Sequence, residues 1–305
     1  MHGEPQFTKP SGTIRHFWAG EKGHGRWFDS ALGLGYGPPP LRAMWSTSPE
    51  VGPMFSSRPK VIAILPARLG STRLPRKPLL ELGGRPLIVQ VLERVRACKD
   101  PFAPGLPLFD EVHVATDSAE IADVVAALGV PAWMTPTSLR SGTARVAFVA
   151  RELDAKLVVN VQGDEPFVDA SVLSPIVLAL IAGADIATAA VPLFQGEGER
   201  SDIVKVVYDS RGDALYFSRA AIPGDRHLGI YGFQAPVLRR LLDLPRGALA
   251  AAEDLEQLDW LAAGERINVV RLPAEAASRF LSIDRPEDLQ AARRRLDELD
   301  EYETP

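Results

Sequence analysis

The chain has 305 residues, a formal net charge of −5 and a hydrophobic content of 46%, which excludes disorder along its whole length. An acidic chain with one cysteine, Cys98, is neither a typical binder of nucleic acid nor a disulfide or thiolate-zinc protein, and we expect a reducing, cytoplasmic setting. It contains no run of about 18 apolar residues and no signal-peptide pattern, so we expect no membrane partner.

Residues 1–60 differ from the rest of the chain. They hold nine of the 25 glycines and eight of the 26 prolines, and they show no helical or strand periodicity. We predict an irregular N-terminal extension here, followed by a folded domain at 61–305. Two other interpretations stay open: a transit peptide, for which the segment is poor in Arg and Ser, and a mis-assigned start, with the protein beginning at Met44 or Met54.

From Val61 onward, short apolar runs alternate with amphipathic segments. Strands are predicted at 61–65, 111–116, 130–134 and 157–162. Between them we predict one helix opening with Pro86 at its first position, one capped by Ser118 and ended by Gly129, and one at 143–153. The strands are continuously apolar, which indicates burial on both faces. This alternation predicts an α/β fold, a mostly parallel sheet with helices on both faces.

The second half of the chain shows a different pattern. Residues 204–209 and 214–218, joined by the turn 210–213, predict a hairpin, and 228–234 predict another strand. A small antiparallel subregion is therefore expected after the parallel one. Helices at 236–242 and 253–263, a strand at 267–272 and a helix from Pro286 complete the prediction.

The loop after the first predicted strand, residues 66–79, combines hydroxyl groups and glycine with four cations, Arg68, Arg73, Arg76 and Lys77. In a parallel sheet, ligands bind beyond the carboxyl ends of the strands, and this loop leaves such an end. The combination suits a polyphosphate, although no Walker motif is present. The alternative is a solvated basic loop.

Two carboxylates are candidate metal ligands. Asp164 follows the buried strand 157–162 directly, where a Mg²⁺ ion held by carboxylates and substrate phosphates is expected; a capped turn is the alternative. Asp284 precedes Pro286 and is a second candidate ligand. It is equally a possible helix N-cap, with Glu287 as its capping-box partner.

Several long motifs occur in order along the chain. They are PARLGSTRLPRKPL (66–79), ATD (115–117), SGTAR (141–145), VVNVQGDEP (158–166), VKVV (204–207), ALYFSRAAIP (214–223), HLGIYGF (227–233), LEQL (255–258) and IDRPEDL (283–289). Together they resemble the 3-deoxy-manno-octulosonate cytidylyltransferases, the CMP-Kdo synthetases. The resemblance covers residues 62–296 and leaves the first 60 residues outside.

The resemblance implies a Rossmann-like nucleotidyltransferase fold and transfer of CMP from CTP to Kdo, giving CMP-Kdo and pyrophosphate for lipopolysaccharide biosynthesis in the cytoplasm. It also implies a Mg²⁺-dependent homodimer whose antiparallel subregion mediates dimerisation. Catalytic roles fall to Lys77, Asp164 and Asp284, the last two as magnesium ligands. Substrate-binding roles fall to Arg68, Ser71, Arg73, Arg145, Gln162, Arg219, His227, Tyr231, Glu253 and Gln257.

The chain departs from the family pattern at three places. Ala144 replaces a carboxylate and Arg140 a glutamine near the expected nucleotide site, the stretch from Arg219 to His227 is short, and 248–250 lacks a carboxylate. Since these changes spare the metal pair, three hypotheses remain open. They are CMP-Kdo synthesis, cytidylyl transfer to another sugar acid such as an amino-Kdo or a sialic-acid-like acid, and nucleotide binding without catalysis.

Overall fold

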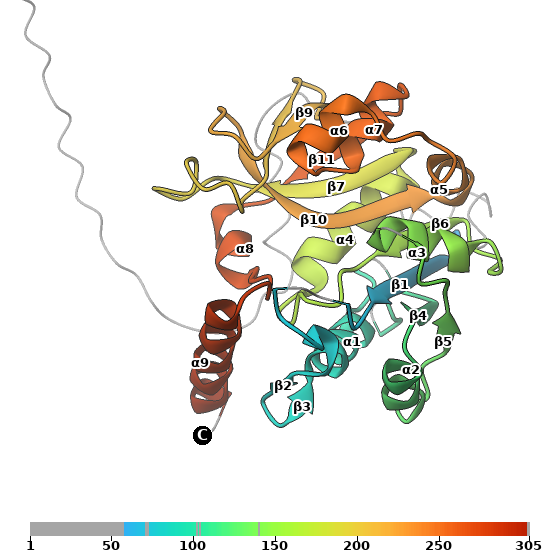
Figure 1. Ribbon diagram of the computed structural model, residues 1–305, viewed down its shortest axis with the longest axis vertical. Coiled ribbons are helices and arrows are strands. Elements are labelled where there is room, and N and C mark those ends of the chain that lie inside the picture. The colour runs from blue at the N-terminus through green and yellow to red at the C-terminus, as the bar shows by residue number, and fades with distance from the viewer. Residues whose placement is uncertain (1–57, 71–72, 102, 104, 140, 304–305) are drawn as a thin grey trace, which may run out of the picture. The chain divides into compact units, whose positions relative to one another are not determined.

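The computed structural model describes residues 58–303, apart from 71–72, 102, 104 and 140. The predicted extension at 1–60 lies almost wholly outside these residues, so the division of the chain at residue 60 stays a prediction. Within the described part, one large sheet organises the chain (Figure 1). In spatial order its main strands are β11 (Ile267–Arg271), β7 (Ile186–Val191), β10 (Asp225–Gln234), β6 (Leu157–Asn160), β1 (Val61–Ala67), β4 (Glu111–Thr116) and β5 (Ala132–Met134).

The sheet is mostly parallel, as predicted. Strands β6, β1, β4 and β5 run parallel to one another, and so do β11 and β7. Strand β10 lies between β6 and β7 and runs antiparallel to both. Two further strands, β8 (Lys205–Tyr208) and β9 (Ala214–Ser218), form the predicted hairpin, and β8 also pairs with β10. The antiparallel strands are therefore joined to the main sheet.

Helices cover both faces of this sheet. One apolar core contains side chains of α1 (Leu87–Ala97), α2 (Ala119–Ala126), α4 (Ala170–Ile181) and α8 (Ala274–Arg279). The other contains side chains of α3 (Gly142–Ala150), α5 (Ala235–Leu241), α6 (Ala248–Glu253) and α7 (Gln257–Ala262). Alternate residues of β1 enter the two cores: Val61, Ala63 and Leu65 one, Ile62 and Ile64 the other. This confirms that the continuous apolar run marks a strand buried on both faces.

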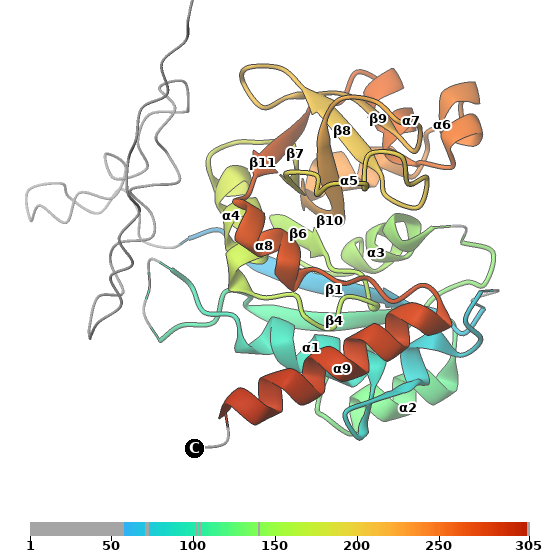
Figure 2. The same ribbon diagram turned by 90° about the vertical axis from the view of Figure 1, so that its left-hand side faces the viewer.

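The last helix, α9 (Pro286–Glu303), packs outside these two layers. Its Leu289 and Ala292 join a third, smaller core with Leu82 of β2 (Glu81–Leu82) and Leu87 of α1. Strands β2 and β3 (Arg85–Pro86) form a short hairpin beside α9 (Figure 2). The C-terminal part of the chain therefore returns to the loop that follows β1.

Several predicted boundaries were wrong. Pro86 is not the first residue of α1, because its extended backbone pairs with Glu81 in the β2–β3 hairpin and the helix begins at Leu87. The helix predicted at 253–263 begins only at Gln257, as α7, and its first predicted residue, Glu253, is the last residue of a separate helix, α6. Asp254 adopts the left-handed conformation (φ 52°) and interrupts the helical hydrogen bonding between them.

The elements that the sequence pattern did not predict include α4, β7 and α8. The first two are almost uniformly apolar and therefore show neither a helical nor a strand period. At Gly232 of β10, a Cβ atom would lie 2.7 Å from Leu180 Cδ1 and 2.8 Å from Ile176 Cγ2. Helix α4 thus packs so closely on β10 that only glycine fits there.

Candidate active site

Lys77 and two carboxylates form the centre of the candidate site. The Lys77 Nζ atom lies 2.5 Å from Asp164 Oδ2 and 3.0 Å from Asp284 Oδ1. Burial disfavours the charged ammonium, but the charges of the two carboxylates outweigh this effect and raise the pKa of Lys77. The structure therefore brings together the three residues expected to be catalytic, which are up to 207 positions apart in the sequence.

Local backbone structure explains this convergence. Arg76 has a left-handed backbone (φ 59°), an unusual conformation for a non-glycine residue, at the turn that precedes the one-turn helix η2 (Lys77–Leu79). On the other side, the Ile283 N–H donates to the Asp164 carbonyl oxygen at 3.0 Å. This hydrogen bond fastens the segment before α9 to the loop after β6, and so places Asp284 beside Asp164.

The structure excludes one of the two interpretations of Asp284, that of a helix N-cap. The Arg285 carbonyl accepts the first hydrogen bond of α9, from Leu289 N–H, so Arg285 is the N-cap residue. The capping carboxylate is that of Asp288 in the first turn, which accepts from the N–H groups of Asp284 and Arg285, before the helix, at 2.9 and 2.8 Å. Asp284 is left to bind Lys77 and, at 3.4 Å, Arg73.

The remaining cations of the loop after β1 have different surroundings. Arg68 and Arg73 are exposed, and Arg73 contacts Asp284 at 3.4 Å, whereas Arg76 forms an ion pair with Glu120 of α2. The predicted substrate-binding residue Ser71 lies outside the described residues, as does Arg140. Some cations of this loop therefore contact other parts of the protein, while the guanidinium groups of Arg68 and Arg73 are exposed to solvent and accessible to a ligand.

Arg145 is placed differently from the other predicted binding residues. Its guanidinium is 2% exposed and contacts Asp117 Oδ2 at 2.6 Å and Thr135 Oγ1 at 2.5 Å. These contacts join the end of β4 to the segment after β5. Since the side chain is buried and paired, its structural role is to hold these two strand ends together.

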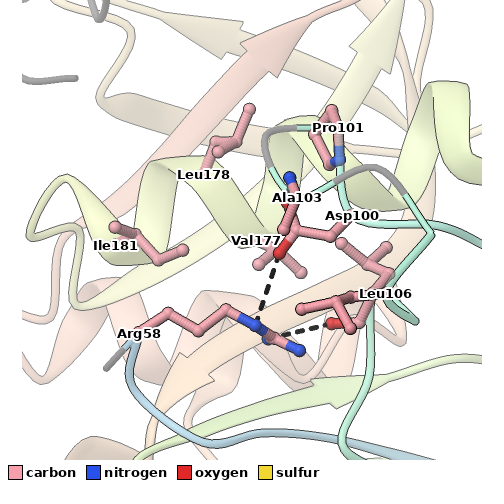
Figure 3. A pocket seen from close by; sticks show the side chains of 9 residues that line it. Arg58, Asp100, Pro101, Ala103, Leu106, Val177, Leu178 and Ile181 are labelled. Atoms are coloured by element: carbon pink, nitrogen blue, oxygen red, sulfur yellow. Dashed lines mark hydrogen bonds and ion pairs between the residues drawn. The ribbon is translucent and has the colours of Figure 1, made fainter. Parts of the chain in front are cut away.

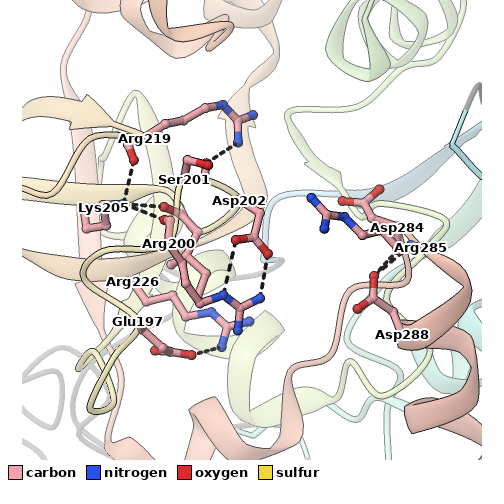
Figure 4. Close-up of polar contacts among 11 residues, drawn as sticks. Glu197, Arg200, Ser201, Asp202, Lys205, Arg219, Arg226, Asp284, Arg285 and Asp288 are labelled. Atoms are coloured by element: carbon pink, nitrogen blue, oxygen red, sulfur yellow. Dashed lines mark hydrogen bonds and ion pairs between the residues drawn. The ribbon is translucent and has the colours of Figure 1, made fainter.

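The residues predicted for sugar-acid binding form a second group, next to the first. Arg219 Nε donates to the Glu253 carbonyl at 3.0 Å. Arg219 Nη1 donates to the Ser201 carbonyl at 3.3 Å (Figure 4). The Glu253 carboxylate accepts from Ser218 Oγ at 2.6 Å and from the Arg219 N–H at 2.7 Å. Burial opposes ionisation of Glu253, but these hydrogen bonds outweigh it and lower its pKa. Glu253 therefore holds Arg219 in place.

His227 and Tyr231 lie on β10 with their ring centroids 5.2 Å apart. Thr188 donates its hydroxyl proton to the Ile230 carbonyl at 2.7 Å, so His227 Nε2, 2.9 Å away, must donate to Thr188. Burial lowers the pKa of His227 to about 3, so the imidazole is neutral at pH 7. The buried Tyr231 hydroxyl has no hydrogen-bond partner among the described residues.

Lys205 is a buried lysine that the sequence did not identify as important. Its Nζ atom donates to three backbone carbonyls, those of Arg200 (2.9 Å), Ile203 (2.8 Å) and Arg219 (2.8 Å), as Figure 4 shows. Burial lowers the pKa of Lys205. The ammonium therefore fixes the loop before β8 against the segment that carries Arg219.

We expect Lys205→Met to lower the free energy of unfolding by about 3 kcal/mol, because three buried carbonyls lose their donor. Chemical denaturation monitored by circular dichroism measures this change. The same substitution at the exposed Lys156 is the matched control and should have almost no effect. Equal losses at the two positions would contradict the structural role assigned to Lys205.

A third polar group extends from the site into the protein. Gln162 follows β6 and donates to Asn160, which donates to Thr143 of α3, which donates in turn to Glu256 at the start of α7. Gln257, the predicted binding residue beside Glu256, is buried. The sequence did not identify Asn160, Thr143 or Glu256, although all three lie within the quoted motifs.

An apolar pocket lies elsewhere in the molecule. It is lined by Leu106, Leu108, the end of α4 and an ion pair of 3.3 Å between Arg58 and Asp100 (Figure 3). Arg58 and Leu108 precede β1 and β4, so the pocket lies at the amino ends of these strands. The candidate site lies at their carboxyl ends, and the pocket is not part of it.

Comparison with known proteins identifies the family. Residues 62–267 match the family model described as cytidylyltransferase. A 3-deoxy-manno-octulosonate cytidylyltransferase of Anaeromyxobacter sp. (strain Fw109-5) is 45% identical over 247 residues, 77% of this chain and 96% of that protein. The enzyme of the same name from Methylococcus capsulatus is 45% identical over 258 residues, 76% of this chain and 95% of that protein.

A solved structure agrees with these relatives. The structure of CMP:2-keto-3-deoxy-manno-octonic acid synthetase complexed with CTP superposes with a TM-score of 0.71 at 33% identity, covering 79% of this chain and 99% of that one. This match confirms the predicted Rossmann-like nucleotidyltransferase fold. In the described part of the chain no helix is long and apolar enough to cross a membrane. The chain belongs to the cytidylyltransferase family.

Proposed function

We propose that this chain transfers CMP from CTP to 3-deoxy-manno-octulosonate (Kdo), giving CMP-Kdo and pyrophosphate. The observation that carries the proposal is the convergence of Lys77, Asp164 and Asp284 at the carboxyl ends of β1 and β6. It occurs in a chain 45% identical to proteins named for this reaction. The proposal includes a setting for the reaction, lipopolysaccharide assembly in the cytoplasm, which the family resemblance implies.

Magnesium is the metal that the site fits. The carboxylates of Asp164 and Asp284 both contact the Lys77 ammonium, so they lie close enough to share one cation. Each would offer a metal ion a hard oxygen ligand. Within the described residues no group of three or more His, Cys, Asp or Glu is placed to hold a metal. Two carboxylates with substrate phosphates and water are a usual arrangement for Mg²⁺. When bound, the ion supplies positive charge that neutralises the phosphate oxygens.

The reaction forms one bond and breaks one. The anomeric hydroxyl oxygen of Kdo attacks the α-phosphorus of CTP, the bond to the β-phosphate oxygen breaks, and pyrophosphate leaves. Such a transfer requires positioning and charge neutralisation and needs no covalent enzyme intermediate. The exposed guanidinium groups of Arg68 and Arg73 bind the triphosphate, and the Lys77 ammonium neutralises the charge that develops as pyrophosphate departs.

The second group of residues binds the sugar acid. Arg219, fixed by Glu253 and Lys205, offers a guanidinium that can pair with the Kdo carboxylate through two hydrogen bonds. Neutral His227 and the unpartnered Tyr231 hydroxyl suit sugar hydroxyls rather than a charged group. Gln162 and Gln257 complete this side of the site. Arg145 supports the nucleotide side through Asp117, without an exposed group of its own.

The proposal is tested by measuring pyrophosphate release from CTP and Kdo with Mg²⁺, and by identifying CMP-Kdo by mass spectrometry. We expect release only when all three components are present, and its loss when EDTA removes the metal. Release with an amino-Kdo or a sialic-acid-like acid but not with Kdo would overturn the choice of substrate. CTP binding without release from any sugar acid would overturn the enzymatic assignment.

The assembly is a further part of the proposal. The resemblance implies a homodimer, with the β8–β9 hairpin and its neighbours as the expected contact region. Sedimentation equilibrium should therefore give about twice the mass of the chain. A single-chain mass at micromolar concentration would contradict this part of the proposal, but it would leave the chemistry of the site unaffected.

A further inference from the structure

A chain of side-chain hydrogen bonds runs from Gln162, which follows β6, to Glu256, which precedes α7. Gln162 Nε2 donates to Asn160 Oδ1 at 3.1 Å, Asn160 Nδ2 donates to Thr143 Oγ1 at 3.2 Å, and Thr143 Oγ1 donates to Glu256 Oε1 at 2.5 Å. Asn160 and Thr143 are 0% and 3% exposed, so water does not compete for these bonds. The four side chains come from β6, the segment after it, α3 and the residue before α7.

Glu256 sets the direction of this chain. The Thr143 hydroxyl gives its single proton to the Glu256 carboxylate, so the Thr143 oxygen must accept from an N–H group. The Asn160 amide therefore turns its nitrogen to Thr143 and its oxygen to Gln162. The Gln162 nitrogen donates one of its two protons to Asn160, so its carbonyl oxygen, Oε1, and one N–H remain for a ligand.

Two hydroxyl groups near the start of α3 donate hydrogen bonds to the Glu256 carboxylate, those of Thr143 and Ser141. Glu256 precedes α7, yet its side chain makes no capping bond to that helix and reaches α3 instead. Burial raises the pKa of Glu256, and the hydrogen bonds from the two hydroxyl groups oppose this rise without cancelling it. The Glu256 carboxylate therefore does not cap α7 and instead accepts hydrogen bonds from hydroxyl groups at the start of α3.

Packing restricts the Gln162 side chain in the same orientation. A Cβ atom at Gly142 would lie 3.2 Å from Gln162 Oε1 and 3.2 Å from Pro66 Cγ. The amide therefore fits closely between the start of α3 and the end of β1. Two residues before Gln162, Asn160 of β6 pairs with Tyr231 of β10.

We propose that Glu256 is a positioning residue for the sugar acid. Through Thr143 and Asn160 it holds the Gln162 carbonyl oxygen toward the ligand, where it accepts a hydrogen bond from a hydroxyl group of the substrate. This inference rests on the proposed function, because it assigns the group at that place to a sugar hydroxyl. It gives Glu256 a role in binding the sugar acid without contact with it.

The isosteric variant Glu256→Gln tests this role. Its amide can donate as well as accept, so the direction of the chain is no longer fixed. We expect the KM for Kdo to rise about five- to tenfold, the worth of one hydrogen bond, with the KM for CTP and kcat unchanged. Glu152→Gln, the same change at an exposed position, is the matched control and should leave all three constants unchanged.

A double-mutant cycle separates positioning from general damage. In a Gln162→Met background the amide is absent, so adding Glu256→Gln should cause no further rise in the KM for Kdo. The inference would be overturned if the two substitutions raised the KM for Kdo by factors that multiply in the double variant. It would also be overturned if Glu256→Gln left the KM for Kdo unchanged, or raised the KM for CTP equally. If Glu256→Gln does not fold, as judged by thermal unfolding, Thr143→Val breaks the same chain and takes its place in the cycle.

The unaltered chain is measured first, and this keeps the two failures distinct. Absence of turnover with Kdo in that measurement overturns the proposed function, and the inference fails with it. Turnover with Kdo together with multiplying effects in the cycle overturns the inference alone.

Discussion

Asp164→Asn is expected to lower kcat for Mg²⁺-dependent pyrophosphate release about 10³-fold. The substitution keeps the shape of the side chain but removes one of the two negative charges that face Lys77. The site then holds a divalent cation more weakly, and the Lys77 ammonium loses the closer of its two partners. Steady-state kinetics over a range of Mg²⁺ concentrations measures both effects, because weaker metal binding also raises the half-saturating Mg²⁺ concentration.

Asp123→Asn on the exposed side of α2 is the matched control for this prediction. It makes the same chemical change far along the chain from the candidate site and should leave kcat within about twofold of the unaltered chain. Thermal unfolding of both variants checks that the fold is intact. A folded Asp164→Asn variant that keeps more than a tenth of the activity would show that Asp164 is not a metal ligand in catalysis.

Phe233→Ala is expected to lower the free energy of unfolding by about 3–5 kcal/mol. Phe233 is 0% exposed in the second half of β10, and its ring lies 5.5 Å from that of Trp260 and 6.0 Å from that of Tyr231. Removing the ring leaves a cavity that the rigid sheet cannot fill. Since Tyr231 packs on the same ring, we also expect the KM for the sugar acid to rise.

Phe194→Ala provides the comparison, because the ring of Phe194 is 45% exposed and lies outside the three cores. Its loss should cost less than about 1 kcal/mol. Urea denaturation of the two variants gives both free energies under the same conditions. Similar losses in the two variants would mean that the aromatic group on β10 does not stabilise the protein as the structure indicates.

The motifs of the sequence predicted the candidate site more completely than the periodicity predicted the fold. Lys77, Asp164 and Asp284 stand out because each follows or precedes an element boundary and carries a charge of the appropriate sign. Glu256, Thr143 and Asn160 do not stand out in this way. A threonine in a helix and an asparagine in an apolar strand have no visible partner until the fold places α3 beside β6 and α7.

The sequence by itself determined the parallel half of the sheet, because a strand such as β1 that sends alternate residues into two cores must be apolar throughout. It also determined which charged residues leave the ends of those strands. Only the tertiary structure decided that β10 lies antiparallel between β6 and β7, and that the carboxylate of Asp288 rather than of Asp284 caps the start of α9. The order of strands in a sheet and the choice among neighbouring carboxylates depend on contacts between residues far apart in the chain, and local propensity carries no information about these contacts.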